Sequence, residues 1–193
     1  QYNVSAGYFK ESTVLPGQEF ARYSIQGTID QKIGSRLKLG INTMNQFNIR
    51  DGEGVSMMFS LLTLSPLFDA YNPDGSYNLY PAVDSPNPET INPLLVNDQS
   101  NWKQQRRRLR TFNSLYGEVD IATGFKYRLN VGLDLWQDNF GEFTGSTTPF
   151  RNGSANGAYV ENTNSWSYTL ENIFTYEKTI ADKHKLLFTG LYS

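Results

Sequence analysis

Apolar and polar residues alternate along several stretches of this chain. In the stretch 19–31, Ile25 and Ile29 occupy one phase, and Gln26 and Asp30 occupy the other. The same alternation recurs in the stretches 36–49 and 128–135. Because successive side chains of a strand point to opposite faces, each stretch predicts a β-strand with one apolar and one polar face.

The connections between these stretches alternate in length. Seven strands are predicted, over residues 2–10, 19–31, 36–50, 108–121, 126–145, 164–178 and 185–192. Tight turns are expected at Gly34, at Gly124 and at 181–183, and longer connections separate the remaining pairs. Short turns at one end and long loops at the other are typical of membrane β-barrels. The predicted fold is therefore all-β, an antiparallel transmembrane β-barrel segment with long extracellular loops.

The composition agrees with this fold and excludes others. The longest apolar stretch, Val55 to Leu64, is far shorter than the ~18–20 residues that a spanning helix needs. Aromatic residues make up 14% of the chain, which suits the aromatic girdles of a barrel. With no cysteine, disulfides and thiolate metal sites are excluded. The net charge of −2 is too small to predict nucleic acid as a partner.

The predicted strand number indicates a part of something larger. Bacterial single-chain barrels have an even number of strands, and seven strands would leave two unpaired edges in the membrane. The chain opens at Gln1 in strand pattern, without a signal peptide. We expect residues 1–193 to be part of a single β-barrel domain, in which 51–105 form a long extracellular loop with a short helix.

The densest cluster of charge consists of Arg106, Arg107 and Arg108, with Lys103 and Arg110 beside them. Guanidinium groups suit phosphate and carboxylate, so the cluster is a candidate for contact with lipopolysaccharide phosphates or with an anionic substrate. The alternative is a solvated rim and lumen face without a specific ligand.

Carboxylates recur at a spacing of four at Asp134, Asp138 and Glu142, with Glu118 and Asp120 on the neighbouring strand. Paired carboxylates can hydrolyse glycosidic bonds. In a barrel, however, they are simply the polar phase of two strands. Since the single histidine of the chain also has no partner for a triad or a zinc site, we predict no enzyme and no catalytic, metal or cofactor site.

The long loop carries the remaining candidates. Tyr71, Tyr77, Tyr80 and Trp102 are candidates for stacking on sugar rings, with packing of the loop itself as the alternative. Asp74 lies in an Asn-Pro-Asp-Gly turn that lacks the spacing of a calcium-binding EF-hand. An amphipathic helix is expected over 55–64, packed on the barrel rim or on a partner. The candidate contacts to substrate or partner are thus Tyr71, Asp74, Tyr77, Trp102, Arg106 and Arg108.

Four short segments and their order resemble the mid-barrel hairpins of a known family. They are Tyr2-Asn3-Val4-Ser5-Ala6-Gly7-Tyr8-Phe9, Arg22-Tyr23-Ser24, Asp30-Gln31-Lys32-Ile33 and Leu37-Lys38-Leu39-Gly40-Ile41-Asn42. The proline-then-aspartate-glycine segment at 65–77 adds to the match. Together they resemble the SusC/RagA family, the TonB-linked outer-membrane transporters of Bacteroidetes.

The resemblance implies a larger object than this chain. It implies a barrel of 22 strands in the bacterial outer membrane, in contact with lipid and lipopolysaccharide. It also implies import of oligomeric nutrients, either glycans or peptides, under a SusD-like surface lipoprotein. TonB would act through a plug domain, and neither the plug nor a TonB box is present in this chain.

Two other interpretations stay open at this point. One is a soluble secreted β-sandwich that binds carbohydrate or acts in adhesion, since such domains also alternate and carry aromatic loops. Predicted strands of about 12 to 20 residues argue against it, because strands are usually five or six residues long. The other is a porin or autotransporter barrel without TonB coupling, which only the N-terminal region would decide.

Overall fold

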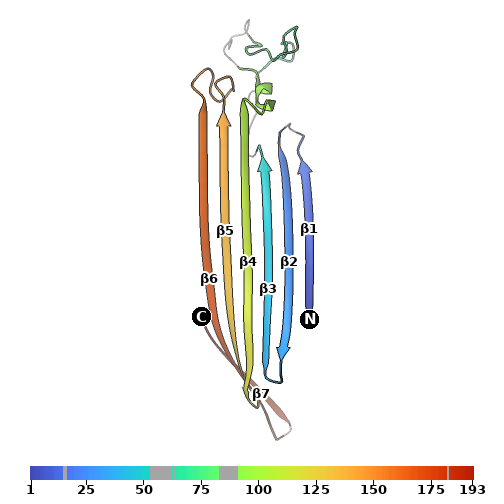
Figure 1. Cartoon of the computed structure of the whole chain (residues 1–193), viewed down its shortest axis with the longest axis vertical. Coiled ribbons are helices and arrows are strands. Elements are labelled where there is room, and N and C mark those ends of the chain that lie inside the picture. The colour runs from blue at the N-terminus through green and yellow to red at the C-terminus, as the bar shows by residue number, and fades with distance from the viewer. Residues whose placement is uncertain (15–16, 53–61, 63, 83–90, 182) are drawn as a thin grey trace.

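Figure 1 shows the fold in a computed structural model, which describes residues 1–193 except 15–16, 53–61, 63, 83–90 and 182. Within the described residues, seven strands form one open sheet in chain order, and every neighbouring pair is antiparallel. The strands are β1 (Tyr2–Ser12), β2 (Glu19–Ile33), β3 (Leu37–Asp51), β4 (Trp102–Ala122), β5 (Phe125–Thr144), β6 (Gly157–Ile180) and β7 (His184–Tyr192). The all-β prediction with antiparallel neighbours is therefore confirmed.

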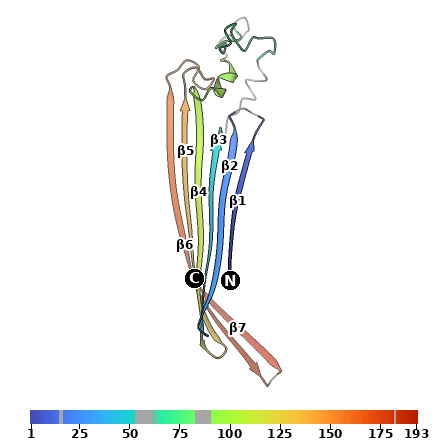
Figure 2. The same cartoon turned by 45° about the vertical axis from the view of Figure 1, so that its right-hand side comes forward.

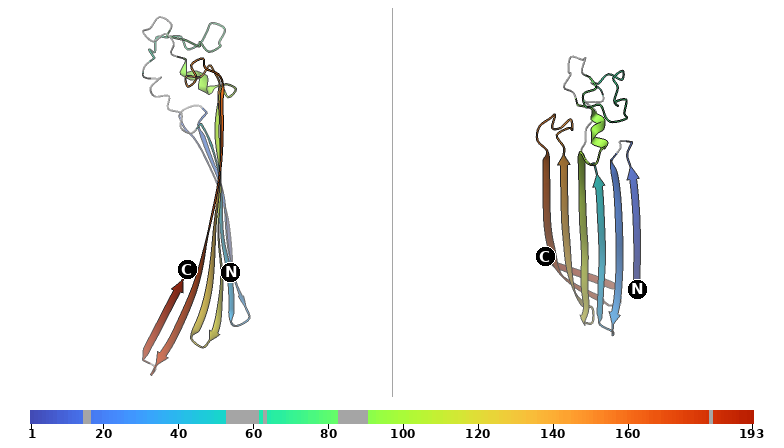
Figure 3. Two further views of the ribbon diagram at one scale, coloured as in Figure 1. Left: turned by 90° about the vertical axis from the view of Figure 1, so that its left-hand side faces the viewer. Right: turned by 45° about the horizontal axis from the view of Figure 1, so that its top comes forward.

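The sheet is tall, single-layered and twisted. Figure 2 shows β7 and the lower part of β6 swinging away from the other strands, and the edge-on view in Figure 3 shows the twist. The described parts of the connections at 52–101 and 145–156 lie at one end of the sheet, and the tight turns lie at the other. We refer to these as the loop end and the turn end.

One face of the sheet is apolar, as the register shows. Ile41 on β3 lies opposite Ile29 on β2 and Leu115 on β4. The row continues through Val131 on β5 to Leu170 on β6. These side chains have no second layer over them, and Ile29 is 50% exposed. We call this side the apolar face; so large an unpartnered apolar surface requires an apolar environment.

Aromatic pairs mark both ends of this apolar face. Phe125 and Phe174 stack at the turn end, with ring centroids 6.3 Å apart, and Trp166 and Tyr168 stack nearer the loop end, at 6.0 Å. Ten residue steps separate Phe125 from Leu135, the partner of Trp166. With the rise of a strand and the usual tilt of barrel strands, these steps span about 25 Å, the height of the apolar band of an outer-membrane barrel.

The opposite side, which we call the polar face, is held together by side-chain contacts across strands. The Tyr116 hydroxyl donates to the Asp30 carboxylate two strands away. It reaches that far because Gly40 lies between them, where a Cβ would overlap the tyrosine ring. The Arg128 guanidinium lies 4.0 Å from the ring centroid, and the Lys38 ammonium 5.4 Å from it. Strands β2 to β5 are thus tied together by one aromatic ring.

The tight turns form where the glycines predict them. Gly124 links β4 to β5 with a φ of 77°, a conformation that only glycine adopts without strain. A Cβ there would also overlap the carbonyl oxygen of Glu177 on β6. The backbone N–H of Glu177 in turn donates to the Gly124 carbonyl at 2.7 Å, so this turn is fastened to the next strand.

Two strands are longer than the alternation predicts. β4 begins at Trp102 rather than at 108, and β6 begins at Gly157 rather than at 164. The long connection therefore ends at residue 101 instead of about 105, and it contains a short 3-10 helix, η1 (Pro93–Asn97). Residues 55–61 and 63, which carry most of the expected helix, lie outside the described residues. No helix that the structure describes is both long and apolar enough to cross a membrane.

Candidate functional site

A ladder of ion pairs crosses the polar face near the loop end. Arg106, Arg108 and Arg110 alternate along β4 and face two carboxylates of β5. Arg108 donates to Asp138 Oδ2 from Nε at 3.1 Å and from Nη2 at 2.6 Å. Arg110 binds both oxygens of Asp134, at 3.2 and 2.7 Å. Arg106 Nε lies 3.6 Å from Asp138 Oδ1, so Asp138 is shared by two guanidinium groups.

Aromatic rings support the same arginines. The Arg106 guanidinium lies 4.9 Å from the centroid of the Phe140 ring, and that of Arg108 lies 5.4 Å from the Trp136 ring. Cation–π contact and ion pairing together fix the planar groups in place. Only 9% of Asp138 is exposed, which makes this ladder the most enclosed charge arrangement on the described part of the polar face.

The ladder leaves two hydrogen-bond acceptors unused. Gln104 donates to Glu142 Oε2 at 2.7 Å, but its own Oε1 accepts no hydrogen bond from any described residue. The same holds for Asp138 Oδ1, which has only the longer contact to Arg106. Buried acceptors are normally satisfied, so these two oxygens, which the groups around them shield from solvent, are exceptions within the described part of the polar face.

The structure divides the basic cluster that the sequence presents as one patch. Arg106 and Arg108 lie on the polar face. Lys103 and Arg107 lie on the apolar face, because successive residues of a strand point to opposite sides and these two have odd numbers on β4. Arg107 donates from Nε to Gln105 Oε1 at 2.7 Å. The two halves of the basic cluster therefore lie on opposite faces of the sheet.

Tyr71 and Tyr77 come together at the tip of the long loop. They form an isolated antiparallel bridge, and their rings stack with centroids 5.4 Å apart. Tyr71 is 54% exposed, so one ring of the pair offers an open face. The buried side chain of Asn92 holds this hairpin by donating to the carbonyls of Ala70 and Asn78, at 2.8 and 2.9 Å.

Asp74 lies in the turn of that hairpin and has a structural partner. Its Oδ1 accepts hydrogen bonds from the Ser76 hydroxyl at 2.6 Å and from the Ser76 backbone N–H at 2.9 Å. These bonds, the hydroxyl first, hold the pKa of Asp74 below its ordinary value. The carboxylate thus stays charged at neutral pH and fixes the turn.

Trp102 is buried rather than presented to a ligand. It is 3% exposed, and its ring lies 6.4 Å from that of Phe150 in the 145–156 connection. With Val96 of η1 it forms the small hydrophobic cluster that joins the long loop to the sheet. Its indole therefore packs where the described part of the long loop joins the sheet, and a contact of Trp102 with substrate or partner stays a prediction.

The sequence-predicted candidates fall into two groups. Arg106 and Arg108 belong to the ladder, and Tyr71, Asp74 and Tyr77 belong to the loop hairpin, with Trp102 packed where the long loop joins β4. The acidic row at Asp134, Asp138 and Glu142 was visible in the sequence, but its pairing with β4 depends on the register. The described residues contain no cluster of three or more histidine, cysteine or acidic side chains arranged to hold a metal ion.

Comparison with known proteins finds relatives of this chain among TonB-dependent receptors. Two relatives from Formosa agariphila, TonB-dependent receptor P3 and TonB-dependent receptor P39, are 24% and 26% identical to this chain and cover 100% and 97% of it. The resemblance to SusC/RagA-type TonB-dependent transporters is confirmed. The chain spans 20% and 17% of the length of these two relatives. No family model matches the sequence.

Solved structures agree on the fold of a SusC/RagA-type transporter. The RagAB peptide transporter has a TM-score of 0.72 at 18% identity, over 98% of this chain and 22% of its own. The RagAB peptide importer in its 'closed-closed' state has a TM-score of 0.73. These relatives and neighbours are receptors and transporters rather than enzymes, in agreement with the expectation of no enzymatic activity. The single open sheet also removes the β-sandwich alternative.

Proposed function

We propose that this chain forms part of the barrel wall of a TonB-dependent outer-membrane importer of oligomeric nutrients, either glycans or peptides. The observation that carries the proposal is the division of one sheet into an apolar face and an ion-paired polar face. In a barrel, the first faces lipid and the second lines the lumen. The names of the relatives favour TonB coupling over an uncoupled porin or autotransporter.

The two ends of the sheet give the proposed orientation. Outer-membrane barrels have short periplasmic turns and longer extracellular loops. The loop end, with the 52–101 and 145–156 connections, is therefore proposed to be extracellular, and the turn end periplasmic. The apolar band of about 25 Å between them fits the lipid phase of such a membrane.

The polar face supports passage of polar oligomers. Its arginines are paired with carboxylates across β4 and β5. The wall therefore presents hydrogen-bond donors and acceptors without a large excess of positive or negative charge. The Arg106 and Arg108 side chains are 32% and 36% exposed, and their guanidinium donors suit the hydroxyl oxygens of sugars or the carbonyl oxygens of peptides. We propose that the ladder of Arg106 and Arg108 contacts the substrate on its way through the lumen.

The partners follow from the same proposal. A SusD-like lipoprotein would cover the extracellular loops, and TonB would act through a plug supplied by the remainder of the polypeptide. The structural neighbours are a peptide transporter and a peptide importer. A likeness in fold alone does not choose between peptides and glycans, so the test includes both.

The test is a deletion of the gene, complemented with the full-length protein. Membranes are fractionated, and growth is followed on oligosaccharides, on oligopeptides and on the matching monomers. We expect the protein in the outer-membrane fraction and loss of growth on one class of oligomer, with growth on the monomers unchanged. Recovery of the protein from a soluble fraction, or unchanged growth on every oligomer, would contradict the proposal.

The loop hairpin provides a prediction within this function. Replacing Tyr71 and Tyr77 together by alanine removes an exposed stacked pair, and aromatic anchors dominate contact energies at such surfaces. We expect binding of substrate or surface lipoprotein to the full-length protein to weaken about tenfold, as for the loss of one anchor. Tyr80→Ala, in the same loop but outside the stacked pair, is the matched control. Equal losses in both variants, measured by calorimetric titration, would show that the pair has no special role.

A further inference from the structure

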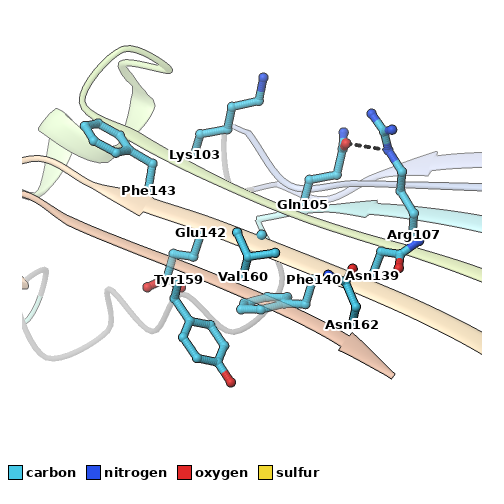
Figure 4. Close-up of a pocket in the computed structure, with 11 residues that line it drawn as sticks. Lys103, Gln105, Arg107, Asn139, Phe140, Glu142, Phe143, Tyr159, Val160 and Asn162 are labelled. Atoms are coloured by element: carbon cyan, nitrogen blue, oxygen red, sulfur yellow. Dashed lines mark hydrogen bonds between the residues drawn. The ribbon is translucent and has the colours of Figure 1, made fainter. Parts of the chain in front are cut away.

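Lys103 and Arg107 form a basic site on the apolar face, toward the loop end. Arg107 lies opposite Ile49 on β3 and Asn139 on β5, and Lys103 lies opposite Phe143. Both cations are exposed strand residues. Figure 4 shows the side chains of Lys103, Gln105 and Arg107 rising from β4 on one side of the sheet, with Glu142 and Tyr159 on the other.

These side chains line a shallow depression of about 410 Å³ between β4, β5 and β6. Its lining combines the two cations with the amides of Gln105 and Asn139 and with the exposed side chain of Val160. Positive charge, amide groups and apolar contact area thus occur together on the apolar-face side of the depression, while Glu142 and Tyr159, which also line it, lie on the other side of the sheet.

The positive charge of this depression is only partly compensated by the described protein. Asp51 on β3 lies opposite Gln105 on the same face and accepts from its Nε2 at 2.8 Å, which leaves two cations against one carboxylate. The nearest carboxylate along β5, Glu142, points to the polar face and accepts from Gln104 there. Arg107 uses Nε for Gln105 and keeps its terminal nitrogens for another acceptor. Neither Lys103 nor Arg107 forms an ion pair with a described residue, whereas Arg108 and Arg110 on the other face both do.

The height of the site relative to the apolar band indicates its occupant. Asn139 lies four residue steps beyond Leu135, the partner of Trp166 at the end of the band. At the rise and tilt of barrel strands, this is about 10 Å beyond the apolar band, in the headgroup region of the extracellular leaflet. A surface at that height, facing outward, meets lipid headgroups rather than a substrate in the lumen.

We propose that Lys103 and Arg107 bind the phosphate of an anionic glycolipid of the outer leaflet, of the lipid A class. A guanidinium and an ammonium provide charge-assisted hydrogen bonds to phosphate oxygens. Asn139 provides a donor for a sugar hydroxyl, while the Gln105 amide already donates to Asp51 and accepts from Arg107, and Val160 and Phe143 contact the apolar surface of the glycolipid. This inference rests on the proposed placement in the outer membrane.

The experiment uses the full-length protein in nanodiscs. Wild type and the Lys103→Ala/Arg107→Ala variant are titrated with bisphosphorylated lipid A, with its dephosphorylated form and with inorganic phosphate. The control, Lys178→Ala/Lys183→Ala, loses the same charge at the turn end. We expect the first variant to bind bisphosphorylated lipid A about tenfold more weakly or worse, from two lost charge-assisted contacts, and the control to match wild type.

The outcomes separate this site from the function on which it rests. Unchanged lipid A affinity in the variant, or equal affinity for the dephosphorylated form, overturns the site while the protein still fractionates with the outer membrane. Competition by inorganic phosphate at equal concentration also overturns it, because the ligand would then be free phosphate. Absence of the protein from outer membranes overturns both proposals.

Discussion

Replacing Ile41 by arginine is expected to lower the free energy of unfolding of the full-length barrel by about 2–4 kcal/mol, the cost of arginine near the bilayer midplane of an outer-membrane protein. Ile41 stands in the row that runs from Ile29 through Leu115 to the outer strands. An arginine there would place a charge among side chains that the proposal assigns to lipid. Urea titration of the protein folded into phospholipid vesicles measures the change.

The neighbouring residue provides the control. Asn42 has nearly the same height on β3 and lies on the opposite face, opposite Thr28 and Ser114. Asn42→Arg is therefore expected to change stability by less than about 0.5 kcal/mol, as for an ordinary surface substitution. If both arginines were equally costly, or equally harmless, the assignment of the apolar face to lipid would be wrong.

The alternation of apolar and polar residues predicted the sheet where one face is apolar, and it failed beyond that zone. Residues 102–107 and 157–163 belong to β4 and β6, yet they carry polar side chains on both faces. Past the apolar band both sides of the sheet meet polar surroundings, so the two-residue period disappears while the backbone ladder continues. Strand ends in this zone are fixed by cross-strand pairing, which a single sequence does not show.

The candidate site illustrates the same limit. The arginines and the acidic row could each be read from the sequence, but the sequence presents Arg106, Arg107 and Arg108 as one cluster, and the strand register divides them between the two faces. Which arginine meets which carboxylate depends on the register of β4 against β5. The contact of Tyr116 with Asp30 across Gly40 escaped the sequence analysis because it spans two strand pairings. The only sign of this contact in the sequence was Gly40, a glycine among the polar-face residues of its strand.

Replacing Asp138 by alanine is expected to destabilise the full-length protein by about 1–3 kcal/mol. Removing one partner of a buried ion pair costs about 3–5 kcal/mol, because the other charge is left without compensation. Here the carboxylate is 11% exposed, but the Arg106 and Arg108 side chains are 32% and 36% exposed, so water screens part of the loss. Thermal and urea unfolding of the purified protein measure the change.

Asp134 provides the matched control for this pair. It also binds an arginine through two hydrogen bonds, but Arg110 is 60% exposed and Asp134 is 26% exposed. Asp134→Ala is therefore expected to cost clearly less stability than Asp138→Ala, as for an exposed pair. A double-mutant cycle of Asp138→Ala with Arg108→Ala is expected to show coupling of about 1 kcal/mol or more. Absent coupling, or equal costs at Asp134 and Asp138, would mean that burial of the ladder contributes nothing to its strength.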